Sequence, residues 1–345
     1  MMVASMPRLE RAYADLSRPL GAFTFAVNAP EDGSRLDLLL RAHFPWRSRT
    51  RFQRMLERGE VTVDGRQAKG SQRVREGQVV AVSLPRDPTA PEQEDASDLV
   101  VLHEDERLLA IDKPSGMTVH PVGRIRHGTL INKLHARYPR TGSRDDVVPR
   151  LGHRLDKDTS GVVLVVKDRV VDAAVTELFT RRRVAKTYLA LVEGGPRDEM
   201  GEVDAPLAQD PDGDTLLHMR VDPQGQAART RWRVLERLER HAWMELSPLT
   251  GRTHQLRVHM AHLGHPIACD HLYGDLRPLW HAGEQGRGGA QVLLDRLALH
   301  AHRLQLEHPV TGQPLDLTSP VPADLVRTLE VLRAGRPAAG RLACR

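Results

Sequence analysis

The segment His153-Arg154-Leu155-Asp156-Lys157-Asp158-Thr159-Ser160-Gly161 runs directly into the apolar stretch Val162-Val163-Leu164-Val165-Val166. The apolar stretch has the length and the β-branched composition of a buried strand. Turn-forming residues precede it, so the charged residues stand on a tight loop at the mouth of that strand. Asp156, which lies between two cations, is a candidate nucleophile or base, although a plain turn with solvated charges has the same pattern.

Two further interpretations of this loop concern metal binding and proton transfer. Asp156 and Asp158 could form a metal-binding Asp-x-Asp pair, but the flanking cations disfavour a divalent ion. His153 could act as a base, and a structural hydrogen bond is the role that we expect for it.

The composition indicates a protein of about two domains with room for a sizeable core, since the chain has 345 residues. The net charge of +5 rests mainly on arginine, and it permits a nucleic-acid partner without establishing one. No apolar stretch approaches the ~20 residues of a membrane span, and the N-terminus lacks the apolar core of a signal peptide. Cys269 and Cys344 form neither a disulfide framework nor a zinc pattern. We therefore expect a cytoplasmic protein that does not enter a membrane.

Periodicity and turn signals divide the chain into five expected parts. These are a flexible leader over 1–30, a small α/β domain over 31–85, a linker rich in Pro, Asp and Glu over 86–97, a larger domain over 98–325 and a C-terminal tail over 326–345. In the small domain, Asp64-Gly65 predicts a hairpin turn between two strands. The larger domain alternates short strand signals with helical patterns near 128–138, 169–182 and 253–263. This predicts an α+β fold, in which the larger domain is built on a mixed, largely antiparallel β-sheet with flanking helices.

Two other segments carry polar side chains next to predicted strands. Asp112-Lys113-Pro114-Ser115-Gly116 follows a strand pattern and is typical of an ordinary loop. Arg181-Arg182-Arg183 ends a predicted helix, where a solvated turn that complements the helix dipole is one explanation. The strand that follows carries Tyr188, either an ordinary core aromatic or a platform on which a base stacks.

The stretch from Thr250 to Met260 reads Thr-Gly-Arg-Thr-His-Gln-Leu-Arg-Val-His-Met and predicts a helix capped by Thr253. Arg257 falls near the edge of its apolar stripe, so it can point into a site. The histidines at 254, 259, 262 and 265 suggest zinc, but no acid stands as in His-Glu-x-x-His and arginines interleave. We expect no metal here.

Taken in this order, the segments around Asp112, His153–Gly161, Lys186–Val192 and Thr250–Met260 resemble the RluA-type family of pseudouridine synthases. The resemblance covers nearly all of 98–321 and is most specific at His153–Gly161. The small domain resembles the αL RNA-binding domain found in a ribosomal protein and in many RNA-modifying enzymes. This places the chain nearest the members that modify large-subunit ribosomal RNA (RluC/RluD-like), and implies uridine isomerisation without a cofactor. Transfer RNA is the alternative substrate.

The resemblance also implies roles for individual residues. Asp156 matches the catalytic aspartate, acting at the sugar carbon or by removing a proton to give a glycal. Arg257 matches the basic residue that pairs with it, and Tyr188 matches the tyrosine that stacks on the uracil. Arg154 matches the arginine that enters the space left by the flipped nucleotide. Further expected RNA contacts are Lys157, Arg252 and His254 in the larger domain, and Arg47, Arg49, Arg51 and Arg54 in the small one.

Two functions outside this class stay open at the level of sequence. One is a non-catalytic RNA-binding or ribosome-assembly factor on the same fold, which would not need Asp156, Tyr188 and Arg257 together. The other is a metal-dependent nuclease or hydrolase that uses Asp156 and the histidines. We expect a monomer, because nothing in the sequence signals an obligate dimer.

Overall fold

The computed structural model describes residues 23–44, 49–83, 91, 93–122, 125–139, 146–211, 218–274, 278–281 and 291–334. The chain divides into two compact units, one made of residues 1–96 and 132–148 and the other of residues 97–131 and 149–345. The expected domain boundaries differ from this division chiefly at 132–148, which group with the first unit. Among the described residues, no helix is long and apolar enough to cross a membrane.

The first unit is a small sheet with two helices. Its elements are β1 (Phe23–Ala26), η2 (Ala29–Glu31), α1 (Leu36–His43), α2 (Arg49–Glu57), β2 (Val61–Val63), β3 (Arg66–Gln67) and β4 (Val79–Val82), with strand order β1-β4-β2-β3. Leu36, Leu39 and Leu40 lie on one face of α1 and are buried with Phe52 of α2. The predicted turn at Asp64 is confirmed, since Asp64 and Gly65 both have positive φ, as a tight β-hairpin requires.

The expectation of a flexible leader over 1–30 is wrong for its last part. Phe23–Ala26 forms β1 and pairs antiparallel with β4. The Phe25 ring stacks on His43 with 4.0 Å between ring centroids and packs against the core of this unit. The aromatic therefore gains enough buried contact to order a segment that lacks a clear periodicity.

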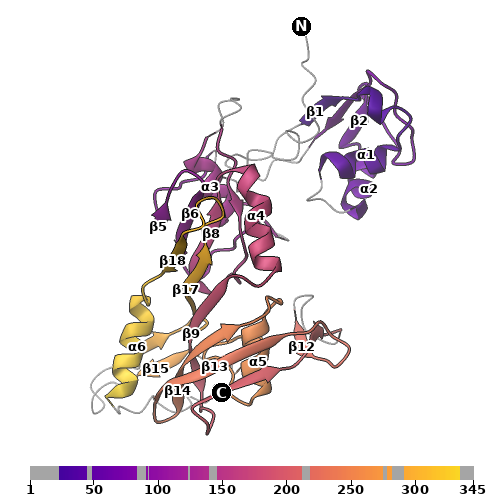
Figure 1. The fold of residues 1–345 in the computed structure, drawn as a ribbon. Helices are drawn as coiled ribbons and strands as arrows, with labels where there is room; N and C mark the ends of the chain where they lie inside the picture. The colour runs from indigo at the N-terminus through magenta and orange to yellow at the C-terminus, as the bar shows by residue number, and fades with distance from the viewer. Residues whose placement is uncertain are drawn as a thin grey trace. The chain divides into compact units, whose positions relative to one another are not determined.

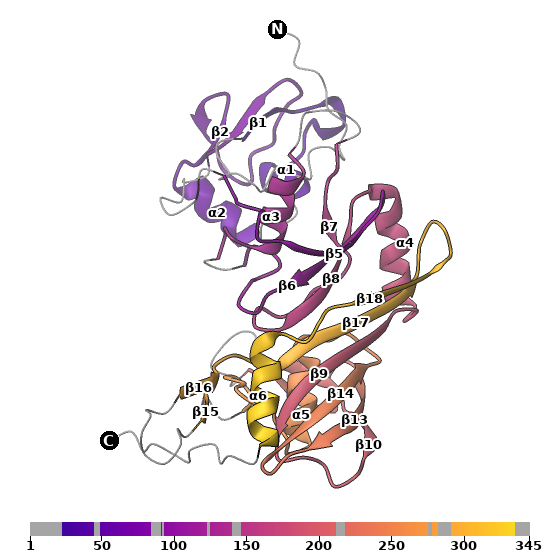
Figure 2. The same ribbon diagram turned by 90° about the vertical axis from the view of Figure 1, so that its left-hand side faces the viewer.

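The second unit is built on one large sheet. Its strands are β5 (Val100–Glu104), β6 (Leu108–Lys113), β7 (Arg150–Leu151), β8 (Ser160–Val166), β9 (Ala185–Glu193), β10 (Met200–Asp204), β13 (Arg229–Arg237), β14 (His241–Pro248), β17 (Leu299–Glu307) and β18 (Pro314–Thr318). They follow the order β10-β13-β14-β9-β17-β8-β6-β5, with β18 beside β17 and β7 beside β8 (Figures 1 and 2). The β17–β8 pair is parallel, and the other pairs among the described strands of this sheet are antiparallel. The predicted mixed, largely antiparallel sheet is therefore confirmed.

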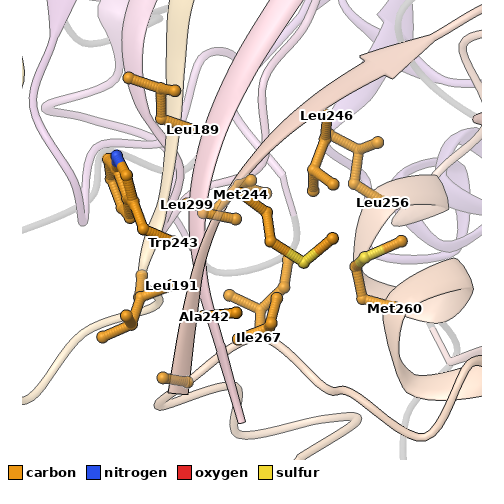
Figure 3. Close-up of a cluster of buried hydrophobic side chains, with 14 of the residues drawn as sticks. Leu189, Leu191, Ala242, Trp243, Met244, Leu246, Leu256, Met260, Ile267 and Leu299 are labelled. Carbon is orange, nitrogen blue, oxygen red and sulfur yellow. The ribbon is translucent and has the colours of Figure 1, made fainter. Parts of the chain in front are cut away.

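Helices and two small hairpins complete the second unit. They are α4 (Arg169–Thr180), α5 (Gln255–His262), α6 (Ala323–Arg333), and the pairs β11 (Leu207–Gln209) with β12 (Met219–Val221) and β15 (Leu279–His281) with β16 (Gln291–Leu294). The helix α3 (Leu130–Arg137) begins in the second unit and has most of its residues in the first. The core of the sheet half that carries β9 and β14 is a cluster in which Leu256 and Met260 of α5 meet Met244 and Leu246 of β14 (Figure 3). This packing holds α5 against the sheet.

The C-terminal tail expected over 326–345 is also partly wrong. α6 extends from Ala323 to Arg333 and buries Leu325 and Leu329 in the same core. The spacing of four residues puts both leucines on one face of the helix, so burial stabilises it. Residues 335–345 of the expected tail lie outside the described part of the chain.

The strand predicted at 162–166 lies inside the sheet and is buried along its whole length. Gly161, at its start, has a φ of +117°, and a Cβ at this position would lie 2.2 Å from the carbonyl oxygen of Ala301. Ala301 is its partner in the parallel β8–β17 pair. Only glycine permits this approach, so the final residue of the His153–Gly161 segment is required by the neighbouring strand.

Candidate active site

A single open cleft of the second unit, about 1930 Å³ in volume, contains most of the predicted site residues. The loop before β8, the start of β9 and the loop that leads into α5 line it. The predicted residues that it brings together are Arg154, Asp156, Lys157, Tyr188, Arg252, His254 and Arg257. The tertiary fold therefore joins three segments that are separated by about 30 to 70 residues in the chain.

Asp156 and Arg257 form the charged centre of this cleft. Nη1 of Arg257 lies 3.6 Å from Oδ2 of Asp156, whose side chain is 29% exposed, whereas that of Arg257 is 3% exposed. A partly exposed carboxylate in the cleft thus faces a buried cation. This arrangement keeps a negative oxygen accessible to a substrate while a buried positive charge stabilises it.

The closest partner of Arg257 is Asp270, a residue that the sequence analysis did not single out. Arg257 Nε donates to Asp270 Oδ2 at 2.7 Å, and Nη2 donates to Oδ1 at 2.6 Å. Burial alone would lower the pKa of Arg257, but the bonds and charge of Asp270, with a smaller contribution from Asp156, raise it. Asp270 also accepts from the backbone N–H groups of Leu272 and Tyr273. Asp270 therefore locks the guanidinium in the position from which it reaches Asp156.

Tyr273 and His254 lie next to this charged group, and of these two residues His254 lines the cleft. The Arg257 guanidinium lies 5.1 Å from the centroid of the Tyr273 ring, and the Tyr273 hydroxyl lies 2.7 Å from Nδ1 of His254. The same hydroxyl accepts from the backbone N–H of Met219 at 2.9 Å. Burial is the main cause that raises the pKa of Tyr273 to about 12, so the phenol stays neutral. His254, predicted as an RNA contact, is largely buried and bonded to this phenol.

The structure corrects the predicted start of the helix that carries Arg257. α5 begins at Gln255, and the residue at its N-cap is His254, not Thr253. His254 has a left-handed backbone, with φ of 54°, which ends the loop and turns its side chain toward Tyr273. The predicted end of the helix is confirmed, since Gly264 follows it with φ of +80°.

Tyr188 lies on β9, as predicted, and lines the cleft half-buried. Burial raises the pKa of its phenol, and the nearby Asp156 carboxylate raises it further. The phenol is therefore neutral and close enough to Asp156 to sense its charge. An aromatic ring near the Asp156 carboxylate can hold a flat base in place.

Lys113 braces the loop that carries Asp156. Its side chain is fully buried, and Nζ donates to the carbonyl oxygens of Pro114, Met117 and Lys157 at 2.8–2.9 Å. Burial is the main cause that lowers the pKa of Lys113 to about 7, while nearby carboxylates, Asp156 among them, oppose the shift. The segment Asp112–Gly116, typical of an ordinary loop, is therefore a support for the site.

Three histidines of these segments, at 153, 259 and 265, have separate structural contacts. His153 Nε2 accepts from the backbone N–H of Leu164 at 3.1 Å, which confirms the predicted structural hydrogen bond. His259 is bonded to Thr230 and Ala205, and His265 to the carbonyl oxygen of Glu193. Within the described ranges, no group of three or more His, Cys, Asp or Glu side chains is placed to hold a metal ion.

The arginines predicted to contact RNA from the first unit lie on or before α2. Arg54 is exposed and Arg51 is half-buried on this helix. Arg49 begins the helix, and its side chain lies outside the described part, as does the whole of Arg47. The helix thus presents a positively charged surface while its apolar side joins the core of the unit.

Comparison with known proteins agrees with this geometry. Residues 107–262 match the RNA pseudouridylate synthase family, and residues 34–80 match the S4 domain. A relative from Xanthomonas campestris, named ribosomal large subunit pseudouridine synthase D, is 38% identical over 339 residues, which cover 95% of this chain and 98% of that protein. A relative of the same name from Nitrosomonas europaea is 39% identical over 317 residues, covering 90% of this chain and 88% of that protein.

A solved structure supports the same assignment. Human RNA pseudouridylate synthase domain containing 4 is 31% identical, with a TM-score of 0.53, over 68% of this chain and 92% of that chain. The match to this structure includes the fold as well as the sequence. The S4 match lies within the first unit. The chain therefore belongs to the RNA pseudouridine synthase family and carries an N-terminal S4 domain.

Proposed function

We propose that this enzyme isomerises uridines of large-subunit ribosomal RNA, with Asp156 as the acting carboxylate. The observation that carries the proposal is the Asp156 carboxylate, which lies 3.6 Å from the buried Arg257 guanidinium in the cleft that also contains Tyr188. The names of the relatives support the choice of ribosomal RNA. We further propose that the enzyme acts in the cytoplasm, since its proposed substrate is ribosomal RNA, and that it acts as a monomer.

The reaction conserves every atom of the uridine. The bond between N1 and C1′ of the sugar breaks, the uracil turns, and C5 bonds to C1′. C5 then loses its proton, and N1 gains one. Asp156 either attacks C1′ or removes a sugar proton to give a glycal, and both routes need its negative charge. Arg257 stabilises that charge, so the carboxylate can act in a site from which the substrate excludes water.

A uridine inside an RNA helix must leave the stack before it reaches Asp156. Extrusion costs a few kcal/mol, and stacking on the Tyr188 ring returns ~1–3 kcal/mol of that cost. Arg154 is exposed on the loop two residues before Asp156. There it can fill the space that the extruded base leaves in the RNA.

The S4 domain contacts the RNA backbone through α2. Replacing Arg54 by Ala is expected to raise Kd for different RNAs by a similar factor and to reduce the slope of log Kd against log salt by about one. Filter-binding titrations at several salt concentrations measure both quantities. Arg75→Ala, at an exposed arginine in the turn before β4, serves as the matched control and should leave Kd unchanged. An unchanged Arg54→Ala slope would remove this residue from the RNA contact.

The substrate assignment is tested with the purified full chain and RNA that lacks pseudouridine. Large-subunit ribosomal RNA and a pool of transfer RNAs are transcribed in vitro, incubated with the enzyme, and mapped for pseudouridine at single-nucleotide resolution. We expect modification at one or a few uridines of the ribosomal RNA. Modification of transfer RNA alone would replace the proposed substrate by the alternative one. Tight binding of ribosomal RNA without any isomerisation would favour a non-catalytic role.

A further inference from the structure

Lys186 is a half-buried cation in the wall of the cleft. It lies on β9 two residues before Tyr188, and both line the cleft. Side chains two apart in a strand lie on the same face, about 7 Å apart along it. The Lys186 Nζ extends toward the loop that leads into α5, since a Cβ at Gly251 would lie 3.5 Å from it. This ammonium group therefore stands beside the proposed position of the target base.

The other lysines that are buried or largely buried have acceptors, and Lys186 differs from them. Lys113 donates to three carbonyl oxygens, and Lys167 donates to Glu104 Oε1 at 2.9 Å and to Asp105 O at 2.7 Å. In the part of the chain that the structure describes, no acceptor or carboxylate partner lies within bonding distance of Lys186 Nζ. Burial lowers the pKa of Lys186, in agreement with a charge that has lost water and gained no partner.

The neighbouring groups do not supply the missing negative charge. His153 is neutral at physiological pH, because burial, together with the charge of Lys186, lowers its pKa to about 4. The Asp156 carboxylate faces Arg257, and Asp158 Oδ2 lies 4.0 Å from His271. The cleft also contains the cations Arg154, Arg182, Arg183 and Arg252. Two further carboxylates line the cleft: Asp316 pairs with Arg303, and Glu307 forms no ion pair with Lys186 in the described part of the chain. The site is therefore suited to an anion that arrives with the substrate.

We propose that Lys186 binds a backbone phosphate next to the target uridine and so positions that nucleotide for the reaction. The inference rests on the proposed function, since it assumes that a uridine stacks on Tyr188. A neutral uracil oxygen would leave the half-buried charge uncompensated, whereas a phosphodiester neutralises it through a charge-assisted bond.

The proposal is tested first with Lys186→Met on a synthetic RNA fragment around a mapped target uridine. Loss of a charge-assisted bond is expected to lower kcat/KM by about 10- to 100-fold. Most of the change should be in KM, because the phosphate contact is made equally in the ground state and the transition state. Lys186→Arg keeps the cation and should restore most of the loss. Arg240→Met, an exposed position that does not line the cleft, serves as the neutral control.

The decisive measurement places one neutral methylphosphonate at each phosphate near the target uridine in turn. With the wild-type enzyme, one linkage should cost about as much as Lys186→Met does, and with the variant that linkage should cost nothing more. Equal costs in both proteins at every linkage, or an unchanged KM in Lys186→Met, would overturn the proposal. If Lys186→Met lowers the melting temperature, Lys186→Gln replaces it in this comparison.

The failure of this inference differs from that of the proposed function. A wild-type chain that modifies no ribosomal RNA counts against the proposed substrate. The same comparison of wild type and Lys186→Met, with and without each methylphosphonate, can then be made with Kd for the RNA that the chain does bind. It still decides the role of Lys186. An enzyme that modifies ribosomal RNA with no sensitivity at Lys186 counts against the phosphate contact alone.

Discussion

Asp156→Asn is expected to abolish pseudouridine formation while leaving RNA binding nearly intact. The amide has almost the same shape as the carboxylate, so the cleft and its other contacts persist. It has no negative charge with which to attack C1′ or remove a sugar proton, and both proposed routes stop at the first step. We expect kcat to fall by at least about 1000-fold. A single-turnover assay on ribosomal RNA, with Kd measured in parallel, separates the loss of chemistry from a loss of binding.

The same loop offers a matched control for this experiment. Asp158 follows Asp156 by two residues and is almost equally exposed, 28% against 29%. Its Oδ2 lies 4.0 Å from Nδ1 of His271, and the described residues show no ion pair between Asp158 and Arg257. Asp158→Asn should lower kcat less than about tenfold, as expected for a surface charge. Full activity in Asp156→Asn, or equal losses in the two variants, would refute the assignment of Asp156.

Arg257→Met is expected to reduce both stability and activity strongly. The substitution leaves Asp270, whose side chain is 0% exposed, as an unpaired buried charge. Removing one partner of a buried ion pair typically costs about 3–5 kcal/mol of unfolding free energy. It also removes the cation that faces Asp156. Urea denaturation measures the first effect, and kcat on saturating RNA measures the second.

A double substitution separates the fold from the chemistry. In Arg257→Met with Asp270→Asn, neither member of this buried ion pair keeps its charge, and the Asn oxygen still accepts from the N–H groups of Leu272 and Tyr273. Stability should therefore recover most of its loss. Activity should stay low, because Asp156 still lacks its cation. Recovery of activity together with stability would mean that Arg257 has only a structural role.

Much of the fold and part of the site can be predicted from local patterns. The apolar run after the Asp156 loop predicts a buried strand, and β8 is that strand. The hairpin at Asp64 and the strand that carries Tyr188 are confirmed in the same way. The resemblance to the pseudouridine synthases is confirmed by relatives that cover nearly the whole chain. The roles of Asp156, Tyr188 and Arg257 stay predictions, now supported by their meeting in one cleft.

Local patterns were insufficient where order depends on contacts with distant segments. The segment that contains Phe25 lacks a clear periodicity. It forms a strand because it pairs with β4 and because Phe25 packs against the core of its domain. The helix of Arg257 begins at Gln255 because His254 takes a left-handed backbone and bonds to Tyr273. In both places a tertiary contact outweighs the local preference of the chain.

The partners of the buried charges also depend on contacts between distant segments. Asp270 is thirteen residues from Arg257, and Lys113 is more than forty from the loop that it braces. Lys186 is distinguished only by the partner that it lacks in the described structure. A residue type and its neighbours in sequence predict periodicity, turns and motifs, because those depend on local geometry. The cost of a buried charge depends on every group within a few ångströms, and those groups come together only when the sheet has formed.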